Sequence, residues 1–239
     1  HSAQPRRTGK TGRVPSREPG GMTMKMYGFW RSIASFRLRV ALNLKGLAYE
    51  EVSVDILGGS QFAPDFDAVN AAHAVPALVE EDGHILFQSL AVLEYLDETH
   101  PEPPLLPRDP RDRAYARALA LVTVADTHPL MVPRIRKHLA RTYGADEAAI
   151  ADWARHWIGE GMATYERLLT RRPPAPYALG DAPGIADICI AGHAMSAELF
   201  GLDRSAFPAF AALADRLFAL DAFASAHALR QPGAPTPKA

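Results

Sequence analysis

Residues 24–46 read MKMYGFWRSIASFRLRVALNLKG, and this stretch decides which fold we expect. The segment Met24–Phe29 favours a short strand. Apolar side chains then recur at helical spacing over Phe36–Lys45, and Gly46 follows as a residue type that commonly ends helices. The stretch therefore predicts a strand followed closely by a helix that begins near Ser35, with Ser32 in the turn between them.

The pattern continues to alternate between strand and helix as far as Thr99. The expected elements are, in order, a strand over Tyr49–Val54, a short helix over Phe62–Val69, hairpin strands over Ala77–Glu80 and Ile85–Phe87, and a helix over Leu90–Thr99. Asp82-Gly83 is a strong turn signal inside the hairpin, and Ser89 is expected to cap the last helix. This order predicts an α/β domain with helices on both faces of one sheet.

The segment Pro101–Pro110 holds five prolines, which is typical of a semi-rigid linker. Strand signals are absent beyond it, and helices are expected over Arg111–Thr142, Asp146–Thr170, Ile185–Phe200 and Phe207–Leu229. We therefore expect residues 22–104 to form the mixed domain and residues 105–239 to form an all-helical domain.

The first 21 residues differ from the rest of the chain. They carry five basic side chains and Glu18, together with several glycines and prolines, and they have too few apolar groups to order a core. We expect a disordered extension or leader here. A nucleic-acid-binding arm is the alternative that these charges support weakly.

The composition excludes several classes of function. The 239 residues include 26 basic and 27 acidic side chains, so the net charge of −1 gives no excess with which to bind a polyanion. A single cysteine excludes a disulfide framework and a cysteine-cluster zinc site, and no histidine spacing suggests another metal centre. Since no apolar run is long enough to cross a bilayer, we expect a soluble, cytoplasmic protein without a nucleic-acid or membrane partner.

Three places in the mixed domain combine polar groups with strand or helix ends. Ser32 precedes a helix, where free N–H groups and the helix dipole favour an anion, although simple capping by Ser32 or Ser35 is the commoner role. Val75-Pro76 places a proline before a strand, where a cis bond would expose backbone groups to an extended peptide and a trans bond would only shape a loop. Ser89 begins another helix.

Longer motifs resemble a known family. The segments 29–42 (FWRSIASFRLRVAL) and 87–97 (FQSLAVLEYLD) and the ending Arg230-Gln231-Pro232 are similar to zeta-class glutathione transferases, which include maleylacetoacetate and maleylpyruvate isomerases. The likeness runs from about Met24 to Pro232. It implies a thioredoxin-like domain that binds glutathione and a helical domain that supplies the pocket of the second substrate.

The resemblance also implies roles for single residues. Ser32 would donate a hydrogen bond to the glutathione sulfur and, with the helix dipole, lower the pKa of the thiol. The residues implied to bind glutathione are Ser32, Ala34, Ser35, Gln61, Val75 beside cis-Pro76, Gln88, Ser89 and His128. Arg37 and Arg134 are implied to bind the second substrate. In this family the thiolate adds to the cis double bond of a maleyl diacid, rotation follows, and elimination gives the trans product, so glutathione is a cofactor. A homodimer is implied as well.

The sequence departs from the family pattern at several positions. Ser32-Ile33-Ala34 replaces Ser-Ser-Cys, Gly184 replaces a capping Ser or Thr before Asp187, and Leu199 stands where relatives have an arginine. Losing that arginine removes a charge-assisted hydrogen bond worth about 1.5–3 kcal/mol. The alternatives therefore stay open: a transferase that conjugates glutathione to a less acidic electrophile, or a non-catalytic binding module. Asp187 and Cys189 are expected to be buried structural residues.

Overall fold

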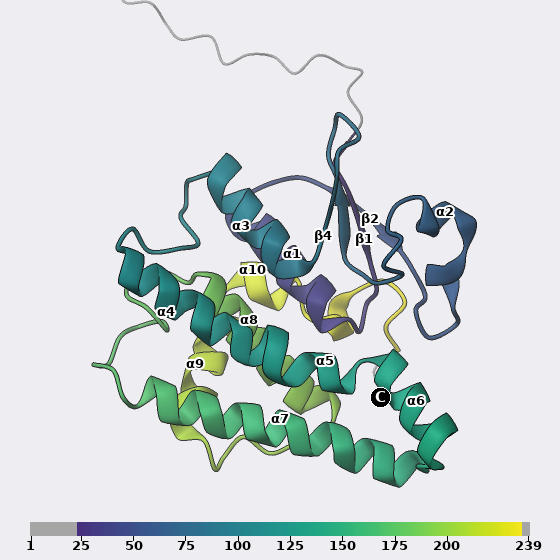
Figure 1. Ribbon diagram of the computed structural model, residues 1–239. Coiled ribbons are helices and arrows are strands. Elements are labelled where there is room, and N and C mark those ends of the chain that lie inside the picture. Colours follow the sequence, from purple (N-terminus) through teal and green to yellow (C-terminus); the bar gives the residue numbers. More distant parts are fainter. Residues whose placement is uncertain (1–22, 236–239) are drawn as a thin grey trace, which may run out of the picture.

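A computed structural model gives the structure of residues 23–235, so the leader expected over residues 1–21 lies outside the described residues. Four strands form one mixed sheet in the order β2-β1-β3-β4 (Figure 1). Their bounds are Lys25–Gly28 for β1, Glu50–Ser53 for β2, Ala77–Val79 for β3 and Ile85–Phe87 for β4. Strand β1 runs parallel to β2 and antiparallel to β3, which pairs with β4 as the predicted hairpin.

Helices lie on both sides of this sheet, as predicted (Figure 1). Helices α1 (Ile33–Lys45) and α3 (Ser89–Thr99) lie on one side, and η1 (Ser60–Phe62) with α2 (Pro64–Asp67) lies on the other. Helix α1 begins two residues before Ser35 because the Ser32 hydroxyl accepts a hydrogen bond from the Ser35 amide at 3.1 Å. It ends where expected, at Gly46 with φ of 65°, a conformation that glycine adopts without steric cost. This arrangement is thioredoxin-like.

The described residues beyond the proline-rich segment are built from helices. The helices and helical turns are α4 (Pro110–Leu121), the π-helical turn η2 (Val122–Thr127), α5 (His128–Met131), α6 (Pro133–Tyr143), α7 (Glu147–Leu169), α8 (Ile185–Leu199), α9 (Pro208–Phe218), α10 (Asp221–Ala224) and η3 (Ala228–Arg230). Helix α8 runs through the middle of this part, and nearly all of its side chains are buried against α1, α4, α7 and α9.

Two segments that were each predicted to form one continuous helix are divided in the structure, so these predictions are wrong. The expected helix over Arg111–Thr142 is divided into several segments, and its sharpest break is at Val132, which has extended backbone because Pro133 follows it. The expected helix over Phe207–Leu229 breaks at Leu220, whose ψ is 132°. The short helix α10 that follows packs on α1, where Asn43 donates a hydrogen bond to the backbone of this helix, so a long-range contact overrides the local helical pattern.

The proline-rich segment is fixed to both parts of the chain. The buried ammonium of Lys45 donates to Asp97 at 2.9 Å and to the carbonyls of His100 and Pro103 at 2.6 Å each. Asp97 also accepts from the amide of Leu105, whose carbonyl in turn accepts from Ile185 at the start of α8. These contacts set the position of α8 relative to α1 and α3.

The start of α8 confirms the structural roles expected for two residues. The buried Asp187 carboxylate accepts from the amides of Gly184 and Ala178 at 3.0 and 2.8 Å, and burial raises its pKa to about 6. Cys189 is fully buried, and burial raises its pKa to about 11. A Cβ atom at Gly184 would lie 2.5 Å from the Leu105 carbonyl oxygen, so this glycine permits a close backbone approach. Among the described residues, no helix has the length and apolar character needed to span a membrane.

Candidate active site

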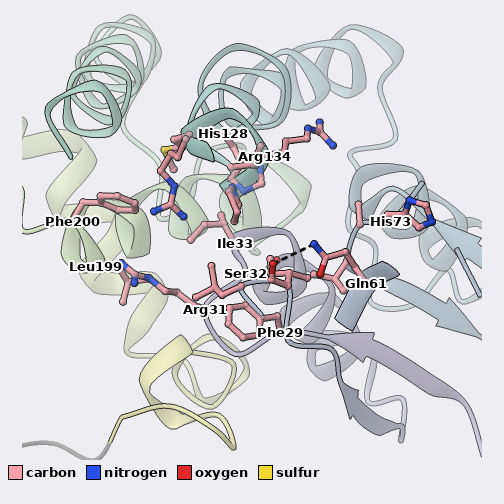
Figure 2. Close-up of a pocket in the computed structure, with 18 residues that line it drawn as sticks. Phe29, Arg31, Ser32, Ile33, Gln61, His73, His128, Arg134, Leu199 and Phe200 are labelled. Atoms are coloured by element: carbon pink, nitrogen blue, oxygen red, sulfur yellow. Dashed lines mark hydrogen bonds between the residues drawn. The ribbon is translucent and has the colours of Figure 1, made fainter. Parts of the chain in front are cut away.

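One cavity opens between the sheet and the helical part, beside the amino end of α1 (Figure 2). Its empty volume is about 890 Å³, part of which is open to solvent. The lining residues come from the turn before α1, the loops on either side of α2, the α5–α6 region and the end of α8. They are Phe29, Arg31, Ser32, Ile33, Ile56, Leu57, Gln61, His73, Ala74, Val75, His128, Met131, Val132, Pro133, Arg134, Arg136, Leu199 and Phe200.

Ser32 lies near the middle of this cavity (Figure 2). Its hydroxyl oxygen accepts from the Ser35 amide, which satisfies one N–H group of the first turn of α1. A hydroxyl can accept and donate at once, so the Ser32 proton is available to a second group. The capping role and the anion-binding role, which are alternatives in the sequence, are therefore compatible at this position.

Ala34 and Ser35, two further residues of the signature that were expected to bind glutathione, do not line the cavity. Ser35 is fully buried and accepts from the Phe29 amide at 3.2 Å. Ala34 is 9% exposed and does not line the cavity. Both residues shape the turn that presents Ser32.

The loop before β3 forms another wall. The Val75–Pro76 peptide bond is cis, as the resemblance implies. Val75 lines the cavity, whereas Pro76 is buried and does not line it. Asn70 fixes the loop, because its side chain donates to the Ala74 carbonyl at 2.8 Å and accepts from the Ala72 amide at 3.0 Å.

Gln61 supplies a polar group without a protein partner. Its side chain is largely buried, and its amide nitrogen donates to the Ile56 carbonyl at 3.2 Å. Its oxygen Oε1 is buried and has no hydrogen-bond partner among the described residues. A buried acceptor of this kind costs free energy until a donor reaches it, so it fits a ligand that carries an N–H group.

Gln88 and Ser89 lie outside the cavity lining, at the start of α3. The expected cap at Ser89 is wrong. Gln88 is the N-cap, with φ of 68°, and Ser89 is the first helical residue. The Ser89 side chain points inward, toward Arg37, and does not cap the helix. The Ser89 hydroxyl accepts from Nε of Arg37 at 3.0 Å. Arg37 is 2% exposed and does not line the cavity; burial lowers its pKa. Its place in the structure is therefore that of a residue that orients Ser89.

His128 lines the cavity at the start of α5 and is half-buried. Burial lowers its pKa well below the usual range, and the positive charge of Arg37 acts in the same direction, followed by His193 and Arg134. His128 is therefore neutral at pH 7. One nitrogen of a neutral imidazole ring donates a hydrogen bond, and the other accepts one.

The permanent charges that line the cavity are all positive. Arg31, Arg134 and Arg136 line it, and none of its lining residues is an aspartate or glutamate. Arg134 is a predicted site residue, whereas the sequence analysis missed Arg31 and Arg136. Arg31 immediately precedes Ser32, which could have indicated it, but Arg136 becomes recognisable only once α6 is known to begin at Pro133. Among residues 23–235, no group of three or more His, Cys, Asp or Glu side chains is placed to hold a metal ion.

Comparisons with known proteins find relatives over most of the chain. Residues 22–98 match the family model described as glutathione S-transferase, N-terminal domain. The chain is 39% identical over 214 residues to maleylacetoacetate isomerase of Pseudomonas aeruginosa, a match that covers 89% of this chain and 99% of the relative. It is 41% identical over 210 residues to maleylpyruvate isomerase of a Ralstonia species, covering 87% and 99%.

Solved structures give the same result. The holo structure of a bacterial zeta-class maleylpyruvate isomerase superposes with a TM-score of 0.85 at 40% identity, covering 88% of this chain and all of that one. A maleylacetoacetate isomerase from Methylobacterium extorquens, crystallised with bound malonate and glutathione, superposes with a TM-score of 0.86 at 48% identity, covering 89% and 100%.

Proposed function

The chain belongs to the zeta class of glutathione transferases, and we propose that within this class it is a glutathione-dependent cis–trans isomerase of maleyl dicarboxylates. One observation carries the proposal: Ser32, at the amino end of α1, faces a cavity in which every permanently charged lining residue is an arginine. Such a site favours a thiolate and a dicarboxylate in the same place.

The residues present fit glutathione. The unpartnered oxygen of Gln61 can accept from an amide of the tripeptide, and the backbone of Val75 beside the cis bond can pair with an extended peptide. Ser89 and Gln88 lie at the start of α3, where helix N–H groups favour a carboxylate. Bound glutathione supplies the thiolate that adds reversibly to the double bond of the substrate and is released unchanged.

The side chains of this protein stabilise the negative charges of both the glutathione sulfur and the substrate carboxylates. The Ser32 hydroxyl donates a hydrogen bond to the sulfur, and the first-turn amides of α1 add the positive end of the helix dipole. Arginine side chains hold the carboxylates of the diacid. The apolar lining residues Phe29, Ile33 and Met131 exclude water from the space between these polar groups.

The test uses a maleyl diacid with glutathione at a concentration far below that of the diacid. An isomerase converts the whole diacid pool to its trans isomer while the free thiol concentration stays constant. Consumption of thiol in step with product, or no conversion at all, would contradict the proposal.

Leu199 favours a second candidate function. This side chain puts an apolar surface on a cavity wall where the family resemblance implies an arginine, so the cavity also suits a neutral electrophile as the second substrate for conjugation. A neutral aryl halide or epoxide supplied with stoichiometric glutathione tests this activity through loss of free thiol. The non-catalytic alternative is less compatible with a half-buried hydroxyl that faces a basic cavity.

We further propose that residues 22–104 bind glutathione, that residues 105–239 supply the pocket of the second substrate, and that the enzyme is a cytoplasmic homodimer. The dimer rests on the family resemblance, together with exposed apolar side chains such as Phe62 and Phe87, which are 63% and 50% exposed. Sedimentation of the purified protein at micromolar concentration tests it, and a monomer mass would refute it.

A further inference from the structure

The cavity wall at the end of α8 brings together two guanidinium groups from different parts of the chain. Arg31 extends from the turn before α1 toward Leu199 and Phe200, on the side of Ser32 away from Gln61 and His73 (Figure 2). Its Cζ atom lies 5.5 Å from the centre of the Phe200 ring. Arg136, from α6, places its Cζ atom 5.8 Å from the same ring. Two cations thus converge beside Leu199.

Within residues 23–235, neither guanidinium has an acidic partner. The ion pairs of the described residues include neither Arg31 nor Arg136. By contrast, Arg39 forms a bidentate pair with the Glu51 carboxylate at 2.6 and 2.8 Å. The Nε atom of Arg136 is instead buried with no hydrogen-bond partner among residues 23–235.

The electrostatic environment of Arg136 is unfavourable for a lone cation. Burial lowers its pKa, and the positive charge of Arg31 lowers it further. An arginine side chain remains protonated in proteins, so this environment does not remove the charge. An anion bound between the two guanidinium groups would relieve their repulsion and satisfy the buried N–H group.

We propose that Arg136 and Arg31 together bind a carboxylate of the second substrate. The fold places Arg136 for this role: α6 begins at Pro133, and Arg136 lies one turn into it, on the face that carries Val132 and Pro133 into the cavity. Arg136 is thereby a specificity-determining residue that selects acidic over neutral second substrates. The identity of this ligand as a diacid rests on the proposed function.

The test measures binding of malonate to the glutathione-loaded protein by titration calorimetry, in the wild type and in Arg136→Gln. We expect the substitution to weaken malonate binding roughly tenfold to hundredfold, the loss expected for one charge-assisted hydrogen bond. Arg141→Gln is the matched control, because Arg141 lies on the same helix, is exposed and does not line the cavity. This control should bind malonate within twofold of the wild type, and glutathione affinity should be equal in all three proteins.

Malonamide, which is neutral, separates charge recognition from packing. Malonamide should bind more weakly than malonate, and its affinity should be the same in the wild type and in Arg136→Gln. Equal malonate affinity in the two proteins, no malonate binding to the wild type, or an equal loss of malonamide binding in the variant would overturn the assignment. Because this experiment needs no turnover, failure of the isomerase assay with intact Arg136-dependent malonate binding would refute the proposed reaction and leave the carboxylate site standing.

Discussion

Ser32→Ala tests the proposed chemistry most directly, because the side chain has two roles that respond differently. As N-cap of α1 its oxygen accepts from the Ser35 amide at 3.1 Å. Replacing a capping serine by alanine lowers the free energy of unfolding by about 0.5–2 kcal/mol. Urea unfolding of the protein without glutathione measures this loss, which we expect near 1 kcal/mol.

The second role concerns the thiol of bound glutathione. A hydrogen bond to a charged group contributes about 1.5–3 kcal/mol, so removing the hydroxyl should raise the pKa of the bound thiol by about 1–2. At pH 7 the thiolate fraction, and with it the isomerisation rate, should fall by at least about tenfold. Ultraviolet titration of the thiolate in the glutathione complex measures the pKa, and the rate should recover toward the wild-type value at higher pH.

Ser35→Ala provides the matched control. This serine is fully buried and accepts from the Phe29 amide, so its loss destabilises the same turn without removing a group that faces the cavity. We expect lower stability but an unchanged thiol pKa. An unchanged pKa in folded Ser32→Ala, or an equal rise in Ser35→Ala, would refute the hydrogen bond from Ser32 to sulfur.

Three further outcomes are expected. Burial lowers the pKa of His193 to about 4, so between pH 6.5 and 5 the unfolded chain takes up a proton that the folded protein does not. Over this interval the free energy of unfolding should fall by about 1.5 kcal/mol more in the wild type than in His193→Gln. If urea unfolding gives the same change in free energy of unfolding for the two proteins between these pH values, the predicted effect of His193 is excluded. Lys45→Met leaves the Asp97 carboxylate buried without its cation and should lower the free energy of unfolding by about 3–5 kcal/mol, whereas Lys25→Met, which removes an exposed pair, should change it by less than about 1 kcal/mol. Gln61→Leu removes the buried, unpartnered oxygen together with the amide that donates to Ile56, so calorimetry should show roughly threefold to tenfold weaker glutathione binding. Equal affinity of the folded variant would argue against a contact with the tripeptide.

Local signals in the sequence were sufficient for the elements that depend on a few neighbouring residues. The strand and helix at residues 24–46 form as predicted because the Ser32 cap and the Gly46 stop act within one turn of the helix. Asp146 likewise caps α7 through the amide of Ala149. One helix prediction failed where a distant contact decides the backbone, at Leu220, since the following short helix packs on α1. The other failed at Val132, where the local signal of Pro133 ends the preceding helix.

The same distinction applies to the candidate site. The family signature led to Ser32, Gln61, Val75, His128 and Arg134, all of which line one cavity. It also led to Arg37, which the structure places beneath Ser89 rather than in the cavity. Arginines at helical spacing look alike in a sequence, and only the packing of α1 against α8 shows which of them is covered.

The sequence by itself determined the class of fold, the order of its elements and the serine at the start of α1, because each of these depends on short-range periodicity, capping or a contiguous motif. Only the tertiary structure decided which charges share the cavity. Arg31, Arg136 and Leu199 come from three segments far apart in the chain, and they meet because α6 and α8 pack beside the amino end of α1. Long-range packing of this kind is a property of the whole core, and no window of the sequence contains it.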